Sequence, residues 1–289
     1  MNLFNILQDL EQVDPEIHDK LNPRRAAIKN ITSFGSKVTL AALPFALGTM
    51  FKRAEAATTD EAVGVLNFAL TLEHLEAKFY THATAVTVEP FLLPAVGTAA
   101  NTAIRKIRDD ENAHVDFLTN VITSLNKTPV NYQYSDFDYT AGGTFSNVFS
   151  NYDTFLAVAQ AFEDTGVRAY KGQAPVLLGE KTFLTAALNI HSVEARHASH
   201  IRQMRRARGG AAAAMKPWIT GANDSGVNIA AVDAVYAGEE SKTQAGVDIT
   251  GLNGVGGKIS ANAATEAFDE FLTKEAVVNI AKLFAPFLA

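Results

Sequence analysis

The chain has 289 residues, 47% of them hydrophobic, so it is long enough to bury a sizeable core. Its formal net charge is −6 and it has no basic stripe, which argues against nucleic acid as a partner. Because cysteine is absent, disulfides, thiolate metal sites, iron–sulfur clusters and cysteine nucleophiles are excluded. Any metal must be bound by histidine and carboxylate groups, which suit iron, manganese or zinc better than copper(I).

Residues 1–57 have the features of an export signal with an extension in front of it. Arg24 and Arg25 precede a hydrophobic run at 38–50, and a small-x-small cleavage pattern follows at 54–56. The arginine pair resembles a twin-arginine signal, although two neighbouring positions depart from that pattern. We expect an exported protein, periplasmic or at the cell surface, that contacts a membrane only through this segment if it is not cleaved.

A second interpretation of the same segment stays open. Leucine and isoleucine residues within 3–10 have helical spacing, which a signal does not require. Under this interpretation residues 1–57 are retained and pack on the rest of the protein or on a neighbouring subunit. The protein would then be cytoplasmic.

The rest of the chain is predicted to be all-α. Four long helical patterns span residues 60–85, 94–126, 151–172 and 180–208. The first two and the last two are joined by short links, which makes antiparallel neighbours, whereas a long stretch joins the second to the third. We therefore expect an antiparallel four-helix bundle at 58–210 with one long crossover between its second and third helices. Residues 211–289 are interpreted as an appendage with amphipathic helices.

Six side chains of metal-ligating type lie at core-facing positions of the four predicted helices. Two helices each have a Glu-x-x-His pair in a hydrophobic seam, and the other two each have one glutamate followed by a tyrosine seven residues later. Residues three apart share a helix face, so the Glu and His of one pair can bind the same ion. The six are Glu73, Glu111, His114, Glu163, Glu194 and His197, and the tyrosines are Tyr80 and Tyr170.

Burial of this set requires compensating positive charge. Each ionised carboxylate removed from water costs several kcal/mol, and four carboxylates close together repel one another. Two divalent ions would match the charge of the four glutamates. We therefore expect a site for two metal ions, with raised carboxyl pKa values when the ions are absent.

These motifs resemble the ferritin-like domain family, which includes exported bacterial proteins and plant desiccation-related proteins. The resemblance covers residues 58–210 and is strongest at residues 67–80 and 109–114, together with Glu163 and residues 194–197. It implies that the six side chains bind two irons and that Tyr80 lies beside them. The chain departs from relatives in having no cysteine for a rubredoxin centre, and its carboxy-terminal segment has no counterpart in storage ferritins.

Some assignments remain open at this stage. Glu76 competes with Glu73 as the ligand of the first helix, and we favour Glu73 because of the tyrosine seven residues later. His191 and His200 are expected beside the site or on the surface. The arginines between residues 202 and 208 are interpreted as a solvated helix end, favoured there by the helix dipole.

We expect a dimetal protein that oxidises ferrous iron or consumes oxygen or peroxide in stress protection, a possible di-iron oxidoreductase of ferroxidase or peroxidase type. Its cofactors would be two iron ions, with manganese or zinc possible, and Tyr80 and Tyr170 would be one-electron donors. The alternative is an exported, desiccation-type structural protein in which metal only staples the bundle or is lost. A third possibility is iron storage in a closed shell. Homo-oligomers are expected.

Overall fold

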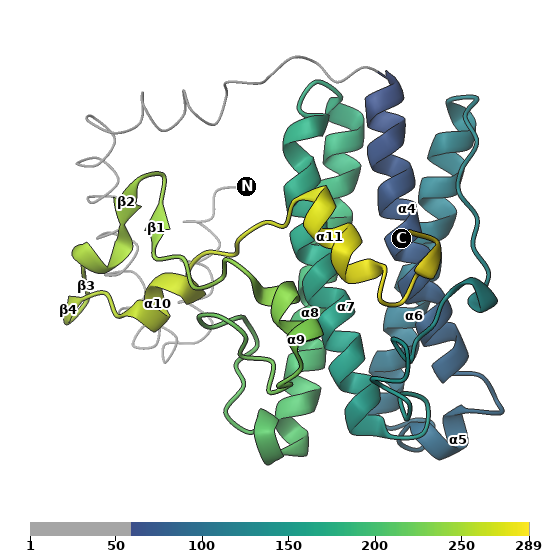
Figure 1. The fold of residues 1–289 in the computed structure, drawn as a ribbon, viewed down its shortest axis with the longest axis horizontal. Helices are drawn as coiled ribbons and strands as arrows, with labels where there is room; N and C mark the ends of the chain where they lie inside the picture. The colour runs from purple at the N-terminus through teal and green to yellow at the C-terminus, as the bar shows by residue number, and fades with distance from the viewer. Residues whose placement is uncertain (1–58, 289) are drawn as a thin grey trace, which may run out of the picture. The chain divides into compact units, whose positions relative to one another are not determined.

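The structure, a computed structural model, describes residues 59–288. The interpretations placed on residues 1–57 lie outside this range. Four long helices dominate the described part (Figure 1). They are α4 (Thr59–Ala83), α6 (Ala99–Ser124), α7 (Tyr152–Gln173) and α8 (Lys181–Arg208).

The four helices form the predicted bundle. α4 packs along α6 and α7 packs along α8, whereas α6 and α8 touch at few points. Short connections turn the chain back between the members of each pair, and residues 125–151 cross over between the pairs (Figure 1). The expected antiparallel four-helix bundle with a long crossover is therefore confirmed.

The helix ends follow from local sequence. Asn151 caps α7 by accepting a hydrogen bond from the Thr154 amide at 2.9 Å. The second helix begins later than the predicted residue 94, because Gly97 has φ +87° and Thr98 then caps α6. Residues before this break form the short helix α5 (Glu89–Leu92).

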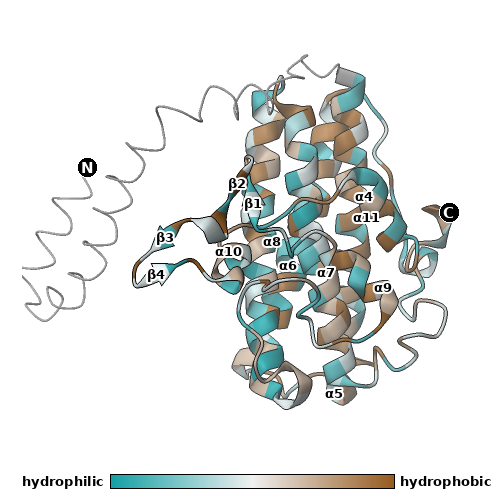
Figure 2. Cartoon of the chain, turned by 60° about the vertical axis from the view of Figure 1, so that its left-hand side comes forward, coloured by the Kyte–Doolittle hydropathy of each residue, from teal (hydrophilic) through white to brown (hydrophobic). Residues whose placement is uncertain are grey.

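Aromatic packing attaches the crossover to the bundle. Phe79 of α4 stacks on Phe155 of α7 with ring centroids 4.9 Å apart. The ring of Tyr139 in the crossover lies 5.4 Å from the Phe79 ring, centroid to centroid. The Tyr139 hydroxyl donates a hydrogen bond to the Leu75 carbonyl at 2.8 Å. Hydrophobic and polar residues are interleaved along the bundle helices (Figure 2). α6 and α8 bury one face each, whereas α7 is buried on nearly all sides from Phe155 to Tyr170.

Most of the chain after the bundle packs against α7 and α8. It contains α9 (Ala230–Asp233), α10 (Ala261–Glu266) and α11 (Lys274–Ala281). Residues 243–259 belong to a separate compact unit. It holds two short antiparallel hairpins, β1 (Thr243–Gln244) with β2 (Val247–Asp248) and β3 (Asn253–Gly254) with β4 (Gly257–Lys258).

Two arginines of α8, Arg202 and Arg205, attach residues 218–225, which follow the bundle, and this corrects their interpretation as part of a solvated helix end. Arg202 is 1% exposed and pairs with Asp164 of α7 at 2.8 Å and with Asp224 at 3.0 Å. Arg205 donates to the Ser225 carbonyl at 2.7 Å and to the Gln160 side chain of α7 at 2.6 Å. The carboxylates and carbonyls of other segments, rather than water, satisfy these side chains.

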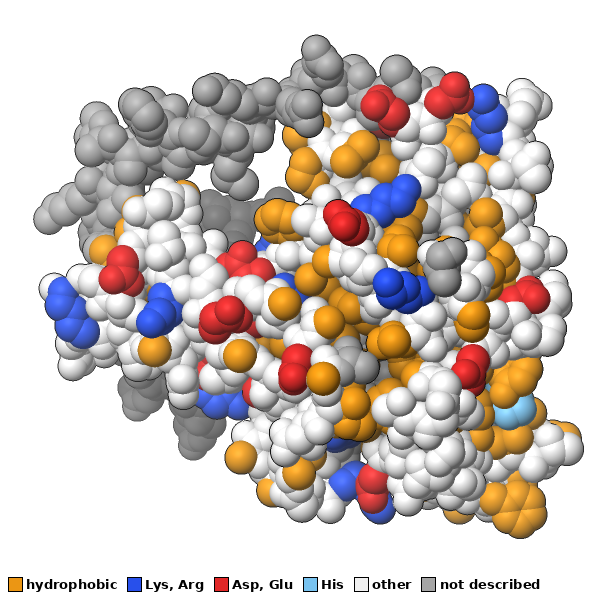
Figure 3. Space-filling view, in the orientation of Figure 1, with side chains coloured by type: hydrophobic (Ala, Val, Ile, Leu, Met, Phe, Trp, Pro, Cys, Tyr) orange, Lys and Arg blue, Asp and Glu red, His pale blue; other side chains and the backbone are white. Residues whose placement is uncertain are grey.

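The surface is mixed in charge. On the face shown in Figure 3, acidic and basic side chains are interspersed over the bundle, in keeping with the modest net charge of −6. Among the described residues, no helix combines the length and the hydrophobicity that a membrane crossing requires.

The Arg202 pair yields a stability prediction. Arg202→Leu should lower the free energy of unfolding by about 3–5 kcal/mol, because it removes the charge partner of the buried Asp164 carboxylate. Urea unfolding measures the change. Arg206→Leu is the matched control, since Arg206 is exposed on the same helix and should change stability by no more than about 0.5 kcal/mol. Equal effects of the two substitutions would contradict the assigned role.

Candidate metal centre

The six sequence-predicted side chains meet in the middle of the bundle. Each of the four long helices contributes at least one of them, and the four glutamates are 0% exposed. The histidine of α8 is also buried, whereas the one of α6 is half-buried. The set is Glu73 on α4, Glu111 and His114 on α6, Glu163 on α7, and Glu194 and His197 on α8.

The six fall into two groups of four, and within each group the ligand atoms lie within 4.8 Å of one another. Glu73 and His114 belong to one group, and Glu163 and His197 belong to the other. Glu111 and Glu194 belong to both. A pair of ions could therefore be held with two shared carboxylates between them and one further carboxylate and one imidazole on each.

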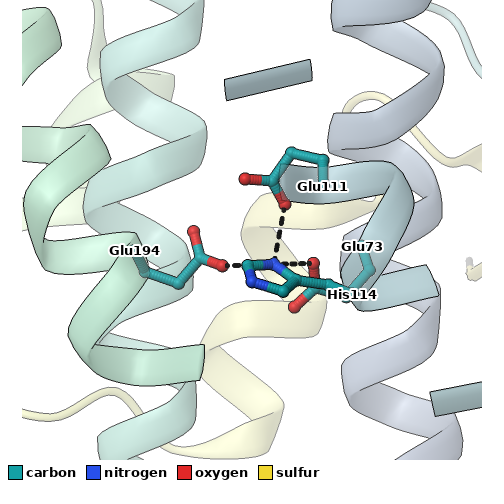
Figure 4. A group of neighbouring side chains, drawn as sticks. All are labelled: Glu73, Glu111, His114 and Glu194. Carbon is teal, nitrogen blue, oxygen red and sulfur yellow. Dashed lines mark hydrogen bonds and ion pairs between the residues drawn. The ribbon is translucent and has the colours of Figure 1, made fainter. Parts of the chain in front are cut away.

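Each histidine points one ring nitrogen at several carboxylates. Nδ1 of His114 lies 3.1 Å from Glu73, 3.2 Å from Glu194 and 3.4 Å from Glu111 (Figure 4). Nδ1 of His197 lies 2.8 Å from Glu111 and 3.4 Å from Glu163. Three acceptors around one nitrogen exceed what a single N–H can satisfy, and a cation at the same place would serve all of them.

Unsatisfied polar atoms support the same conclusion. Several ligand atoms among the described residues are buried without a hydrogen bond. They are both carboxylate oxygens of Glu111 and of Glu194, one oxygen of Glu163, and Nδ1 of His197. Such atoms are costly unless something unseen binds them. The donor set, oxygen and imidazole with no sulfur, fits iron, manganese or zinc.

The two tyrosines form hydrogen bonds between α4 and α7. Tyr80 of α4 donates a hydrogen bond to Glu163 of α7 at 2.5 Å, and Tyr170 of α7 donates one to Glu73 of α4. Both side chains are buried, and burial together with the neighbouring carboxylate charges raises both tyrosine pKa values well above their ordinary value. The phenols therefore remain protonated and orient one carboxylate of each group.

The cluster perturbs the pKa values of its own members. Burial raises the pKa of Glu111 to about 7, and the charges of Glu73 and Glu163 raise it too, although the nearby rings of both histidines act against this. Burial disfavours the charged ring of His197, but its contacts with the carboxylates of Glu163 and Glu111 raise its pKa to about 12. Without metal, protons therefore supply part of the missing positive charge.

Asp110 is a neighbour of the site that sequence reasoning missed. Its carboxylate accepts a hydrogen bond from Nε2 of His197 at 3.2 Å, so the imidazole is held between a carboxylate and the cluster. Such an outer contact fixes the ring orientation of a metal-binding histidine. The signal was available, since Asp110 directly precedes Glu111, but it lies off the core-facing seam.

A hollow of about 420 Å³ lies between α6 and α8 beside the cluster. His114 and His197 form its inner wall, and Asp110, Arg196 and His200 line it as well. The glutamate side chains of the cluster are at most 1% exposed, whereas the His114 side chain is 12% exposed. The hollow is thus the side from which the ligands meet solvent.

The remaining candidates are placed as follows. Glu73 belongs to the cluster, as the sequence favoured. Glu76 is also buried beside it and is 3% exposed. Burial and, after it, the charge of Glu194 raise the pKa of Glu76 well above its ordinary value. Nδ1 of His191 donates a hydrogen bond to the Val167 carbonyl oxygen at 3.0 Å, and His191 is outside both groups. His200 is exposed at the hollow.

The pKa of Glu111 predicts how metal stabilisation depends on pH. Because this pKa is about 7 in the fold and 4.5 ordinarily, the protonated carboxyl stabilises the metal-free fold below pH 4.5, and this contribution is lost as the pH rises to about 7. Metal binding requires deprotonated ligands and strengthens as the pH rises. Thermal unfolding of metal-free and zinc-loaded protein should show a wider gap in Tm at pH 8 than at pH 5.5; an unchanged gap would contradict the assignment.

Comparison with known proteins agrees with this geometry. Residues 61–207 match the family described as the ferritin-like domain, a span that includes all six residues of the cluster. No curated protein matches the chain. Because the family match spans more than half of the 289 residues, the chain belongs to the ferritin-like domain family.

Proposed function

We propose that this protein binds two iron ions in the bundle and uses them to oxidise ferrous iron or to consume oxygen or peroxide, as a protection against oxidative stress. The observation that carries the proposal is the pair of overlapping four-residue groups that share Glu111 and Glu194. A single structural ion needs four ligands, whereas this arrangement provides six side chains with two in common. Such sharing is suited to a coupled pair of ions.

Bound iron would supply two adjacent one-electron redox centres. The chain's own residues then have distinct tasks. Glu111 and Glu194 hold the centres together, while Glu73 with His114 and Glu163 with His197 complete each side. The hydrophobic seam residues above and below the cluster, such as Ile104, Leu118 and Ile201, are buried and keep bulk water out.

The tyrosines are proposed as one-electron donors. Tyr80 donates its hydrogen bond to Glu163, so this carboxylate would accept the proton when the phenol gives up an electron. Tyr170 stands in the same relation to Glu73. An electron from a tyrosine would take the place of one that ferrous iron would otherwise supply for the reduction of oxygen or peroxide.

Ions and small oxidants would reach the centre through the hollow between α6 and α8. Its inner wall is formed by His114 and His197, and Asp110 offers a carboxylate on the way.

Export and assembly into a homo-oligomer, expected from the amino-terminal segment and the carboxy-terminal composition, form part of the proposal. Cell fractionation and light scattering measure them.

The first test is oxidation of added iron. Ferrous ions at two per chain, mixed with oxygen or peroxide in a stopped-flow instrument, should give the near-ultraviolet absorbance of ferric product. Glu111→Ala should reduce the rate by at least about a hundredfold, since it removes a ligand common to both groups. Asp109→Ala is the matched control, because the Asp109 side chain is 62% exposed on the same helix. Equal rates in the two variants would remove the proposal.

The second test concerns the tyrosines. Tyr80→Phe should retain two bound ions but lose the radical signal in electron paramagnetic resonance after oxidation with limiting ferrous ion. Tyr139→Phe is the control, because this buried tyrosine bonds to the Leu75 carbonyl rather than to a cluster carboxylate. A radical signal that persists in Tyr80→Phe and in Tyr170→Phe would show that neither residue donates.

A structural role of the metal is the second candidate, and the unsatisfied buried atoms of Glu111 and Glu194 favour it. Here the ions only stabilise the bundle of an exported, desiccation-type protein. Thermal unfolding with and without chelator, set beside the oxidation assay, separates the two. A large loss of Tm on chelation without any turnover would favour the structural role.

A further inference from the structure

The hollow between α6 and α8 is larger than the passage of ions requires. Its volume of about 420 Å³ lies within the range of pockets that bind small organic molecules, roughly 300–1,000 Å³. The two helices that border it touch at few points, and the small side chains Ala103 and Ala113 line it on α6. The hollow therefore has room for an organic molecule beside the metal centre.

Part of the wall of the hollow is hydrocarbon. Ile107 lines it on α6 and Val193 lines it on α8. A hydrated inorganic ion gains nothing from such a surface, whereas the hydrocarbon part of an organic molecule is removed from water there. The wall thus favours an occupant that has an apolar part.

The polar groups of the hollow are mainly hydrogen-bond donors. Arg196 of α8 has five N–H donors and no acceptor, and it is exposed. It forms no hydrogen bond or ion pair with any other residue that the structure describes. The same holds for His200, one helical turn further along α8. Both side chains are free to bind an acceptor that enters the hollow.

The acceptor that the hollow itself contains is already in use. Among the described residues that line it, Asp110 alone is acidic. Its carboxylate pairs with Lys106 and also accepts a hydrogen bond from His197. Because Asp110 and Lys106 balance each other, Arg196 leaves the hollow with positive charge. A guanidinium binds a carboxylate through two parallel hydrogen bonds, a geometry that suits this ligand well.

We propose that the hollow is a binding site for a small organic carboxylate. Its carboxylate group is bound by Arg196, and its hydrocarbon part lies against Ile107 and Val193. Since His114 and His197 form the inner wall, the bound molecule lies directly beside the metal centre.

Occupancy of this site obstructs the path by which ions reach the centre. A bound carboxylate should therefore slow the oxidation of added iron. This consequence rests on the proposed function, whereas the binding itself does not.

Calorimetric titration of the full-length protein tests the binding without any turnover. Octanoate and benzoate are the probes, and octanamide and benzamide are their uncharged counterparts. Both acids should bind at least about tenfold more tightly than their amides, because only the acids form charge-assisted hydrogen bonds. Octanoate should also bind at least about tenfold more tightly than acetate, which has almost no hydrocarbon to bury.

Variants locate the site. Arg196→Gln should weaken octanoate binding by about tenfold or more, and Arg206→Gln is the matched control, since Arg206 is exposed on the same helix but does not line the hollow. Ala103→Trp fills the hollow and should abolish binding. Ala195→Trp, at an exposed position of α8 outside the hollow, should not. A crystal structure with benzoate should show its carboxylate on the Arg196 guanidinium.

The outcomes separate this site from the proposed function. Equal affinity for acids and amides, or unchanged affinity in Arg196→Gln, overturns the site even if iron is oxidised. Binding of octanoate by a protein that oxidises no iron overturns the proposed function and leaves the site standing. If both occur, octanoate should slow iron oxidation in the wild type and much less in Arg196→Gln. An unchanged rate with octanoate bound would overturn the obstruction of the path.

Discussion

The structure depends on one constraint: five carboxylates lie where a four-helix bundle normally buries hydrocarbon. Glu73, Glu76, Glu111, Glu163 and Glu194 are each at most 3% exposed. Their mutual repulsion and loss of hydration must be offset, and the means available within the chain are few. The two tyrosines and two histidines supply hydrogen bonds, yet several carboxylate oxygens stay unsatisfied. Positive charge from outside the chain is what the arrangement lacks.

The bundle is arranged to make this interior rigid. The ligands come from the middle of long helices, so their positions are set by backbone hydrogen bonds rather than by loops. Around them, the aromatic contacts of Phe79 attach the crossover to the same helices, and the buried arginines Arg202 and Arg205 attach residues 218–225. A cluster held this firmly keeps its carboxylates close even when protons replace ions.

Much of this could be predicted from the sequence, because it is encoded locally. The helical periods identified the four helices, and seam spacing identified six residues that the structure brings together. The start of α6 was placed too early, because Gly97 and Thr98 outweigh the helical pattern before them. The partners of Arg202 could not be predicted, since Asp164 and Asp224 lie on separate segments. Glu76 ranked second because alanine rather than tyrosine follows it seven residues later, yet its side chain is buried beside the cluster as well.

The way the ligands are divided among the helices has a mechanical consequence. The helices associate as two hairpins, α4 with α6 and α7 with α8, and α6 and α8 touch at few points. Each four-residue group nevertheless draws on both hairpins: the first combines Glu73, Glu111 and His114 with Glu194, and the second combines Glu163, Glu194 and His197 with Glu111. Ions bound as proposed would therefore connect the two hairpins along the side where α6 and α8 have few contacts. Occupancy of the centre would then be mechanically coupled to the α6–α8 side of the bundle, where the hollow opens.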